Sequence, residues 1–229
     1  MKLNGITDVF FDLDHTLWDF DKNSKLTFDK IFKINDIEVD LDEFVSVYEP
    51  INFQYWKLYR EEKIDKKNLR FNRLQDTFTI LKLQVHETTI NKLSDDYITY
   101  LSTYNHLFNN AVEILHYLSK DYQLHIITNG FNQVQRKKLV NSKIDVFFKS
   151  VTDSESVGVK KPNSKIFNHA ITLANTSPEQ SIMIGDNLEA DIYGALNVGI
   201  DAIFYNLNNT SVDNGIKQIT SLQELKDYL

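Results

Sequence analysis

The chain of 229 residues is 42% hydrophobic and 25% charged, which is typical of a folded globular protein. Its 25 basic and 32 acidic residues give a formal net charge of −7, which disfavours nucleic-acid binding but allows a small anionic ligand. The absence of cysteine excludes disulfides and thiolate metal sites. No apolar stretch has transmembrane length and no signal peptide is recognisable, so we expect a cytoplasmic protein with no membrane partner.

The first apolar run predicts a buried strand over residues 6–11, followed by Asp12, Asp14 and Thr16. If the backbone stays extended, the two carboxylates point the same way, because strand side chains repeat every two residues. Close like charges raise each other's pKa unless a divalent cation neutralises them, so the pattern predicts a metal site with a spare carboxylate. The alternative is that Asp14 or Thr16 only caps the next helix.

Residues 17–105 show apolar residues at helical spacing, and no convincing strand interrupts them, so we expect an all-α insert. Asn23 or Ser24 is expected to cap its first helix. Several large aromatic side chains of the insert are expected in its core: Tyr55, Trp56, Tyr59 and Phe71. Its arginines are expected on solvated faces: Arg60, Arg70 and Arg73.

After residue 105, strands and helices alternate. Strands are expected over 124–128, 146–151, 181–185 and 202–205, and helices over 111–118, 131–140, 165–173, 188–196 and 222–228. The alternation predicts an α/β, Rossmann-like, doubly wound parallel sheet built from residues 1–16 and 106–229, with a polar loop over 206–214. Ligands of such sheets bind beyond the carboxyl ends of the strands.

Three later segments put polar residues at strand ends or just before a helix. These residues are Thr128, Asn129 and Gly130, then Lys160 and Lys161, then Asp186 and Asp191. Acid-x-acid, hydroxyl, lysine and Gly-Asp, in this order, resemble the motifs of the haloacid-dehalogenase-like hydrolase superfamily. The resemblance extends from the first strand to residue 191, and it implies that the helical insert is a cap placed just after the first motif.

The two acids of the first motif suit phosphomonoester hydrolysis, which needs in-line attack, charge neutralisation and a proton for the leaving oxygen. Asp12 suits the nucleophile that forms an aspartyl-phosphate, and Asp14 suits the general acid and base. Mg²⁺, with Mn²⁺ as a substitute, would be held by Asp12, Asp186 and the backbone carbonyl of Asp14. Asp191 is expected to ligate the ion or orient its ligands; alternatively, it only complements the dipole of the following helix.

The remaining motif residues suit a phosphoryl group. Thr128 and the amides of Asn129 and Gly130 are expected to bind phosphate oxygens. Lys161 is expected to supply a fixed positive charge to the nucleophile and the phosphate. We prefer Lys161 to Lys160 because members of the superfamily place this lysine directly before the proline.

Within the superfamily, residues 11–20, 127–131 and 157–163 look like those of bacterial pyrimidine 5′-nucleotidases that act on noncanonical nucleotides. This resemblance implies a small phosphorylated metabolite as partner, namely a nucleoside 5′-monophosphate with a pyrimidine base. For the assembly we expect a monomer or a homodimer, and the sequence does not choose between them. The base preference rests on the resemblance alone. Other readings stay open: a phosphoglycolate or sugar-phosphate phosphatase, a phosphomutase, a phosphonatase, a haloacid dehalogenase, or a catalytically silent binding module.

Overall fold

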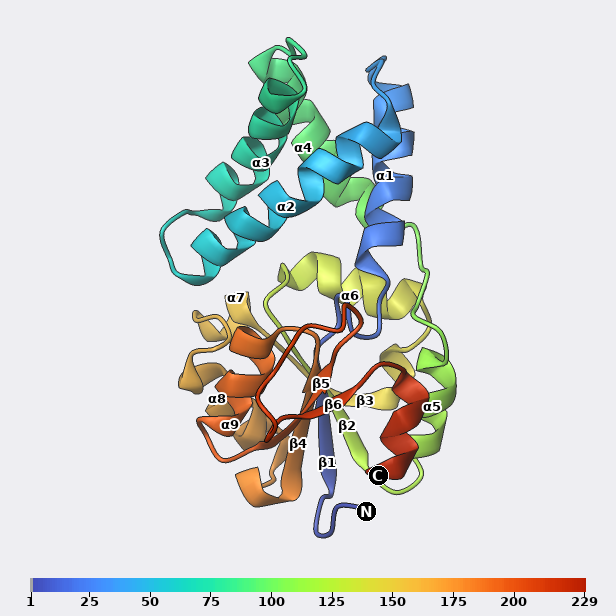
Figure 1. The fold of residues 1–229 in the computed structure, drawn as a ribbon, viewed down its shortest axis with the longest axis vertical. Coiled ribbons are helices and arrows are strands. Elements are labelled where there is room, and N and C mark those ends of the chain that lie inside the picture. Colours follow the sequence, from blue (N-terminus) through green and yellow to red (C-terminus); the bar gives the residue numbers. More distant parts are fainter. Residues whose placement is uncertain (1) are drawn as a thin grey trace. The chain divides into compact units, whose positions relative to one another are not determined.

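The computed structural model describes residues 2–229 and divides the chain into two compact units. An α/β unit comprises the chain up to Phe20 together with Asn105–Leu229, and a helical unit comprises Asp21–Tyr104 (Figure 1). The first boundary differs from the expected one, because residues 17–20 lie in the α/β unit. Trp18 forms β-bridges with Asp14 and with Leu107, which tie this short segment to the sheet unit.

The α/β unit is built on a six-stranded sheet with the order β3-β2-β1-β4-β5-β6, in which every neighbouring pair is parallel. The strands are β1 (Asp8–Phe11), β2 (Gln123–Thr128), β3 (Phe148–Asp153), β4 (Ser181–Gly185), β5 (Asp201–Tyr205) and β6 (Lys217–Ile219). With helices on both of its faces, the sheet confirms the predicted Rossmann-like α/β fold, and the helical unit within the chain confirms the predicted helical insert.

The helices of this unit connect successive strands. They are α5 (Ala111–Leu118), α6 (Asn132–Asn141), α7 (Ser154–Val157), α8 (Ser164–Ala174) and α9 (Gly194–Leu196), with 3₁₀ turns η1 (Asp145–Phe147), η2 (Pro178–Gln180) and η4 (Leu222–Asp227) and a π-helical turn η3 (Leu188–Tyr193). Helices α8 and α9 lie on one side of the sheet, and α5 and η4 lie on the other (Figure 1).

The core of the α/β unit fixes the position of β1. Val9, Phe10 and Phe11 are fully buried, as their continuous apolar run predicts. Phe10 packs in one cluster with Phe167 from α8 and with Met183 from β4. Each such buried side chain contributes about 1.5–3 kcal/mol to folding, so the end of β1 is held rigidly.

Several expected elements differ in detail. The strand expected over 146–151 starts and ends two residues later, as β3. The helix expected over 188–196 is divided into η3 and α9. Helix α7 and strand β6 were not expected, because neither element is long enough to show a period in the sequence.

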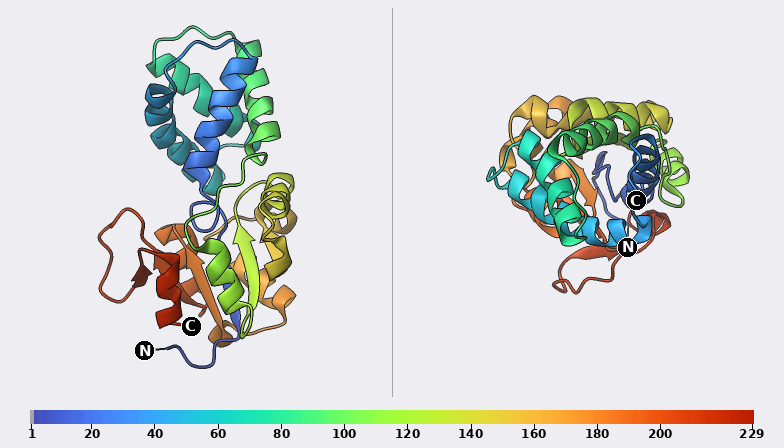
Figure 2. Two further views of the ribbon diagram at one scale, coloured as in Figure 1. Left: turned by 90° about the vertical axis from the view of Figure 1, so that its right-hand side faces the viewer. Right: turned by 90° about the horizontal axis from the view of Figure 1, so that it is seen from above.

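The helical unit contains four helices packed side by side (Figure 2). They are α1 (Phe20–Ile34), α2 (Leu41–Arg60), α3 (Lys66–Ile80) and α4 (Glu87–Leu101). Phe28 lies at the centre of the core, and its ring centroid is 4.8 Å from that of Phe44 and 4.6 Å from that of Tyr48. The expected N-cap was wrong, because α1 begins at Phe20 and Ser24 instead hydrogen-bonds Tyr97 over 2.8 Å inside the bundle.

Two expectations for side chains of the helical unit also need correction. Of the four aromatics expected in the core, only Tyr59 is buried, and the other three are partly exposed. Arg73 is 2% exposed rather than solvated. Its guanidinium lies 5.0 Å from the ring centroid of Tyr97 and donates to Asn52 Oδ1 over 2.8 Å, so a ring face and an amide replace water around this cation.

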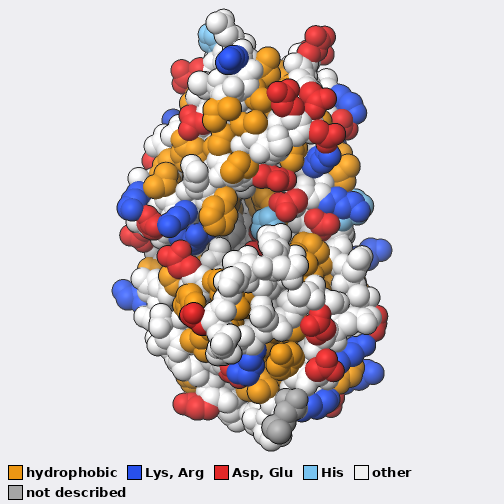
Figure 3. All heavy atoms as spheres, viewed as in Figure 1, with side chains coloured by type: hydrophobic (Ala, Val, Ile, Leu, Met, Phe, Trp, Pro, Cys, Tyr) orange, Lys and Arg blue, Asp and Glu red, His pale blue; other side chains and the backbone are white. Residues whose placement is uncertain are grey.

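The face of the molecule drawn in Figure 3 carries charges of both signs. Acidic and basic side chains alternate over the described residues of the face in Figure 3, without a continuous basic stripe. Across residues 2–229, the helices are too short or too polar for any of them to span a bilayer.

Candidate active site

Three neighbouring strands end at the same edge of the sheet and bring the predicted residues together. Phe11 is level with Ile126 of β2 and with Ile184 of β4. Asp12 follows β1 directly, and its backbone N–H donates to the carbonyl of Ile184 over 2.9 Å. Thr128 ends β2, so the hydroxyl motif and the first acid lie on adjacent strands.

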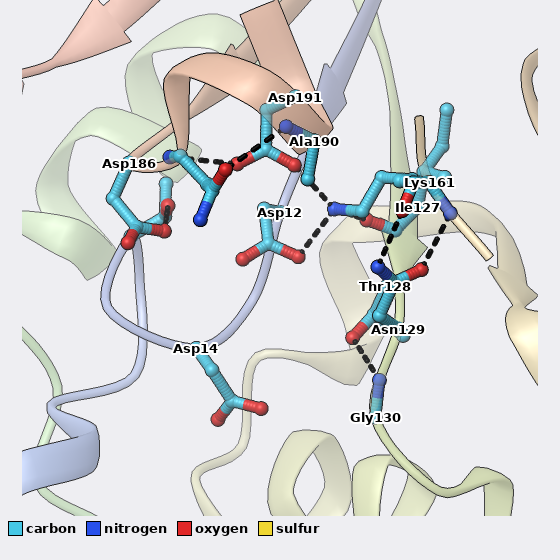
Figure 4. Close-up of polar contacts among 12 residues, drawn as sticks. Asp12, Asp14, Ile127, Thr128, Asn129, Gly130, Lys161, Asp186, Ala190 and Asp191 are labelled. Carbon is cyan, nitrogen blue, oxygen red and sulfur yellow. Dashed lines mark hydrogen bonds and ion pairs between the residues drawn. The ribbon is translucent and has the colours of Figure 1, made fainter. Parts of the chain in front are cut away.

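A cluster of three carboxylates occupies this edge. Asp12, Asp186 and Asp191 each offer an oxygen, and these oxygens all lie within 4.8 Å of one another (Figure 4). Asp191 reaches the cluster because Gly185 leaves room for it: a Cβ atom at Gly185 would lie 2.3 Å from Asp191 Oδ2. The same Oδ2 accepts a hydrogen bond of 3.0 Å from the backbone N–H of Asn187.

Lys161 is the cation of this cluster. Its Nζ lies 2.7 Å from Asp12 Oδ1 and 2.6 Å from Asp191 Oδ1, and it donates to the carbonyl of Ile127 over 2.7 Å. The side chain of Asn129 holds the lysine's backbone, because its Oδ1 accepts from Lys161 N over 2.7 Å and its Nδ2 donates to Lys161 O over 3.0 Å. Lys161, rather than the neighbouring lysine, is therefore the residue that the fold brings to Asp12.

The cluster carries more negative than positive charge. Burial is the largest cause that raises the pKa of Asp12 to about 8; Lys161 opposes the shift, and Asp191 and Asp186 add to it. Burial and Asp191 likewise raise the pKa of Asp186 to about 8. Burial lowers the pKa of Lys161, but its attraction to Asp12 and Asp191 outweighs burial and raises that pKa. Three close carboxylates with one ammonium offer the hard oxygen donors and the excess charge that suit Mg²⁺.

Asp14 lies apart from this cluster and has its own partners. Its Oδ1 is 2.5 Å from Lys138 Nζ, and its Oδ2 accepts from Gln135 Nε2 over 2.9 Å. In Figure 4 its carboxylate stands away from those of Asp12 and Asp186. The two acids of the first motif are therefore held by different cations.

The hydroxyl groups of the site are also engaged. Thr128 Oγ1 accepts from the backbone N–H of Gly130 over 3.1 Å and from Gln135 Nε2 over 2.8 Å. Thr16 is fully buried, and its Oγ1 donates to Asp186 Oδ1 over 3.2 Å, so it orients one acid of the cluster.

Sequence reasoning missed Gln135 and Lys138, which α6 places beside Asp14 and Thr128. Lys138 stands in a basic run whose other members, Arg136 and Lys137, are exposed, so composition alone does not single it out. The helical period does contain a signal. Gln135 and Lys138 lie four and seven residues after the buried Phe131, which puts both on the buried face of α6.

Comparison with known proteins identifies the family of the chain. The family model of the haloacid dehalogenase-like hydrolases matches residues 9–205, which confirms the predicted resemblance. The chain is 33% identical to the pyrimidine 5′-nucleotidase PynA of Streptococcus pneumoniae, covering 96% of this chain and 94% of that protein. It is 30% identical to the glyceraldehyde 3-phosphate phosphatase of Methanothermobacter thermautotrophicus, covering 96% and 98%. The solved structure of the HAD-hydrolase YfnB of Bacillus subtilis, bound to magnesium, has a TM-score of 0.87 and 26% identity, covering 97% of each chain.

Proposed function

The chain belongs to the haloacid dehalogenase-like hydrolases, and from this premise we propose that it is a Mg²⁺-dependent phosphomonoesterase acting through an aspartyl-phosphate on Asp12. The separate placement of its two acids is the observation that carries the proposal. Asp12 lies in the cluster with Lys161, whereas Asp14 is held outside it by Lys138 and Gln135. A phosphatase needs a nucleophile and a separate proton donor, whereas a dehalogenase attacks carbon with the first acid alone.

The nucleophile is one oxygen of Asp12. Lys161 holds Oδ1, and the described residues give Oδ2 no hydrogen bond. Oδ2 attacks phosphorus as the bond to the leaving oxygen breaks, and Asp14 donates a proton to that oxygen. Asp14 then takes a proton from a water molecule that attacks the same phosphorus, which releases phosphate and restores the Asp12 carboxylate.

The carboxylate cluster fits a divalent cation. We assign its ligands to Asp12, Asp186 and the backbone carbonyl of Asp14. Both oxygens of Asp191 already have partners, Lys161 Nζ and the N–H of Asn187, so we assign Asp191 to holding Lys161 and orienting the site. Mg²⁺ supplies positive charge beside the phosphoryl oxygens when it is bound.

The phosphoryl group would be bound by the Thr128 hydroxyl, the backbone N–H of Asn129 and the ammonium of Lys161. Gly130 contributes through Thr128, because its N–H donates to the threonine oxygen. Gly130 also leaves space for Gln135, whose side-chain carbon would lie 2.3 Å from a Cβ atom at that position.

Two substrate classes have support. A nucleoside 5′-monophosphate with a pyrimidine base is favoured by the likeness to PynA, which extends over 96% of this chain. A small sugar phosphate is the second candidate, because the glyceraldehyde 3-phosphate phosphatase is 30% identical over nearly the same span. Both substrate classes are phosphomonoesters of alcohols, so the chemistry assigned to Asp12 and Asp14 serves either one.

The test is phosphate release from a panel containing pyrimidine and purine 5′-monophosphates, sugar phosphates, phosphoglycolate and 2-haloacids, with Mg²⁺ and with EDTA. We expect Mg²⁺-dependent release with pyrimidine 5′-monophosphates as the preferred substrates. Preference for sugar phosphates would retain the chemistry and change the substrate class. Halide release from a 2-haloacid, without phosphate release from any ester, would refute the proposal.

A further inference from the structure

Gln135 connects two residues to which the proposed function gives different roles. Its Nε2 donates to Asp14 Oδ2 over 2.9 Å and to Thr128 Oγ1 over 2.8 Å. The side chain is 1% exposed, so water does not compete for these bonds. One amide nitrogen therefore contacts both the proton-transfer group and the phosphate-binding hydroxyl.

The bond to Thr128 fixes the direction of the threonine hydroxyl. A hydroxyl has one hydrogen to donate and two lone pairs that accept. Gly130 N–H and Gln135 Nε2 occupy both lone pairs of Thr128 Oγ1. The hydroxyl hydrogen is thus left as an outward donor, and a donor is what a phosphoryl oxygen requires.

The bond to Asp14 fixes the plane of its carboxylate. Gln135 holds Oδ2 and Lys138 holds Oδ1, so the two oxygens have donors from successive turns of α6. Lys138 is itself fixed, because it is 2% exposed and its Nζ lies 4.3 Å from the ring centroid of Trp18. Asp14 is therefore held in one orientation.

Burial of the Gln135 side chain on α6 lowers the stability of the fold. Its Oε1 is buried without a hydrogen-bond partner among the described residues, and such an orphan acceptor costs free energy. An unbranched apolar residue of the same length would avoid that cost. The contribution of this amide therefore lies in its two donated hydrogen bonds rather than in packing.

We propose that Gln135 is a positioning residue that sets the Thr128 hydroxyl as a phosphate donor and orients Asp14 for proton transfer. The inference rests on the proposed phosphomonoesterase function and names a residue beyond the four motifs. Lys138 supports only the second half of this role, because its ammonium bonds Asp14 and, among the described residues, donates no hydrogen bond to Thr128.

The primary test is Gln135→Met, which keeps the length and removes the amide. Its matched control is Gln133→Met, the same change at an exposed position of α6. We expect Gln135→Met to lower kcat/KM for a nucleoside 5′-monophosphate by about 10- to 100-fold, as partial loss of general acid catalysis predicts. For p-nitrophenyl phosphate, whose leaving group needs no proton, we expect only about a fivefold loss, equivalent to one phosphate hydrogen bond. The control is expected to match the wild-type protein on both substrates.

A second variant separates the two contacts of Gln135. Lys138→Met, with Lys137→Met as its exposed control, is expected to lower kcat/KM for the nucleoside 5′-monophosphate by about tenfold and to leave phosphate affinity unchanged. Gln135→Met is expected to weaken binding of inorganic phosphate about fivefold in titration calorimetry with Mg²⁺ present. Its thermal unfolding midpoint is expected within a few degrees of wild type, because the orphan acceptor is removed together with the two bonds.

Two results would overturn the inference if the wild-type protein is a phosphomonoesterase. The first is that Gln135→Met keeps the wild-type kcat/KM and the wild-type phosphate affinity. The second is that Gln135→Met loses activity equally on both substrates, in proportion to the loss of folded protein, which marks a structural role.

If the wild-type protein hydrolyses no phosphomonoester, the proposed function fails, and the phosphate titration alone then tests the inference. In that case weaker binding by Gln135→Met supports the positioning of Thr128, whereas equal binding, or no binding by either protein, refutes it.

Discussion

A buried carboxylate lies at each end of β1, and the two carboxylates have different kinds of partner. At the amino end, Asp8 accepts from His125 Nε2 over 3.0 Å and from Thr7 Oγ1 over 2.6 Å. His125 in turn forms a hydrogen bond of 2.8 Å with Ser150 through Nδ1, so a network of hydrogen bonds extends across three strands. Burial lowers the pKa of His125 although Asp8 opposes the shift, so the ring is neutral near pH 7.

At the carboxyl end, Asp12 lies among two further carboxylates with Lys161 as their cation. Here burial and the neighbouring carboxylates raise the pKa of Asp12 although Lys161 opposes the shift, and one ammonium pairs with a cluster of three carboxyl groups. The comparison shows that a buried acid is not by itself a sign of chemistry. The sign is an acid whose charge the fold leaves unbalanced, because such a site costs stability unless a ligand completes it.

The largest expected effect comes from removing Asp12, the proposed nucleophile. Asp12→Asn should lower phosphate release at least about 10⁴-fold, because an amide oxygen does not form the phosphorylated intermediate. The fold should persist, since the substitution removes a buried charge and keeps the shape. Phosphate release and thermal unfolding, measured on the same preparation, check both statements. Near wild-type turnover would assign the nucleophile elsewhere.

The next effect concerns the cation. Asp186→Asn should weaken Mg²⁺ binding by about 10- to 100-fold, because a carboxylate ligand becomes a neutral amide. Titration calorimetry of the purified protein measures it. Asp153→Asn is a suitable control, because Asp153 is a buried acid that caps α7 rather than joining the cluster. Equal loss of Mg²⁺ affinity in both variants would contradict the assignment.

The amino end should behave in the opposite way. Asp8→Leu should lower the free energy of unfolding by about 1–3 kcal/mol, because the buried His125 loses its acceptor. The kcat per folded molecule should stay at the wild-type value. Urea unfolding and active-site-normalised rates measure the two quantities. A large loss of kcat with intact stability would mean that the hydrogen-bond network of Asp8, His125 and Ser150 also contributes to the reaction.

The two ends should also differ in pH dependence. The raised pKa values of Asp12 and Asp186 mean that the folded metal-free protein retains protons between about pH 4 and 8 that the unfolded chain has released, so stability falls as pH rises through that window. In the proposed site Mg²⁺ would replace those protons, so the stabilisation by Mg²⁺ should grow with pH. We expect the shift of the thermal midpoint by Mg²⁺ to be larger at pH 8.5 than at pH 6, by about 2–4 °C for each kcal/mol of added stability. An equal shift at both pH values would contradict the charge imbalance.

The smallest expected effect is on the stability of the protein at acidic pH. The lowered pKa of His125 means that its contribution to stability is present above pH 6.5 and is lost as pH falls below that value. His125→Gln should flatten that part of the stability profile and leave the Mg²⁺ effect unchanged. Unfolding midpoints between pH 5 and 8 measure the change. An unaltered acid profile would place the titrating group elsewhere.

Much of the fold was predictable because its signals are local. Apolar runs of strand length end where Asp12, Thr128 and Asp186 begin, so the order of motifs alone indicates which side chains meet at one edge of the sheet. The contacts of Asp14 were not predictable in this way. Lys138 is 124 residues away from it along the chain, and only the packing of α6 against the first motif brings the two together.

The helical unit shows the same limit. Its helical content follows from the apolar period, but burial of Arg73 among tyrosine rings depends on how three helices pack. A charged residue in a helical sequence is ordinarily solvated, so no local signal marks the exception.

Trapping the phosphorylated protein tests the central claim most directly. The Mg²⁺-loaded enzyme is mixed with a nucleoside 5′-monophosphate, quenched, and treated with borohydride, which reduces an aspartyl-phosphate to homoserine. Peptide mass spectrometry then locates the modified residue. The proposed function predicts homoserine at position 12 in the wild-type protein and none in Asp12→Asn. Hydrolysis that proceeds with no modified peptide, or with modification of another acid, would contradict it.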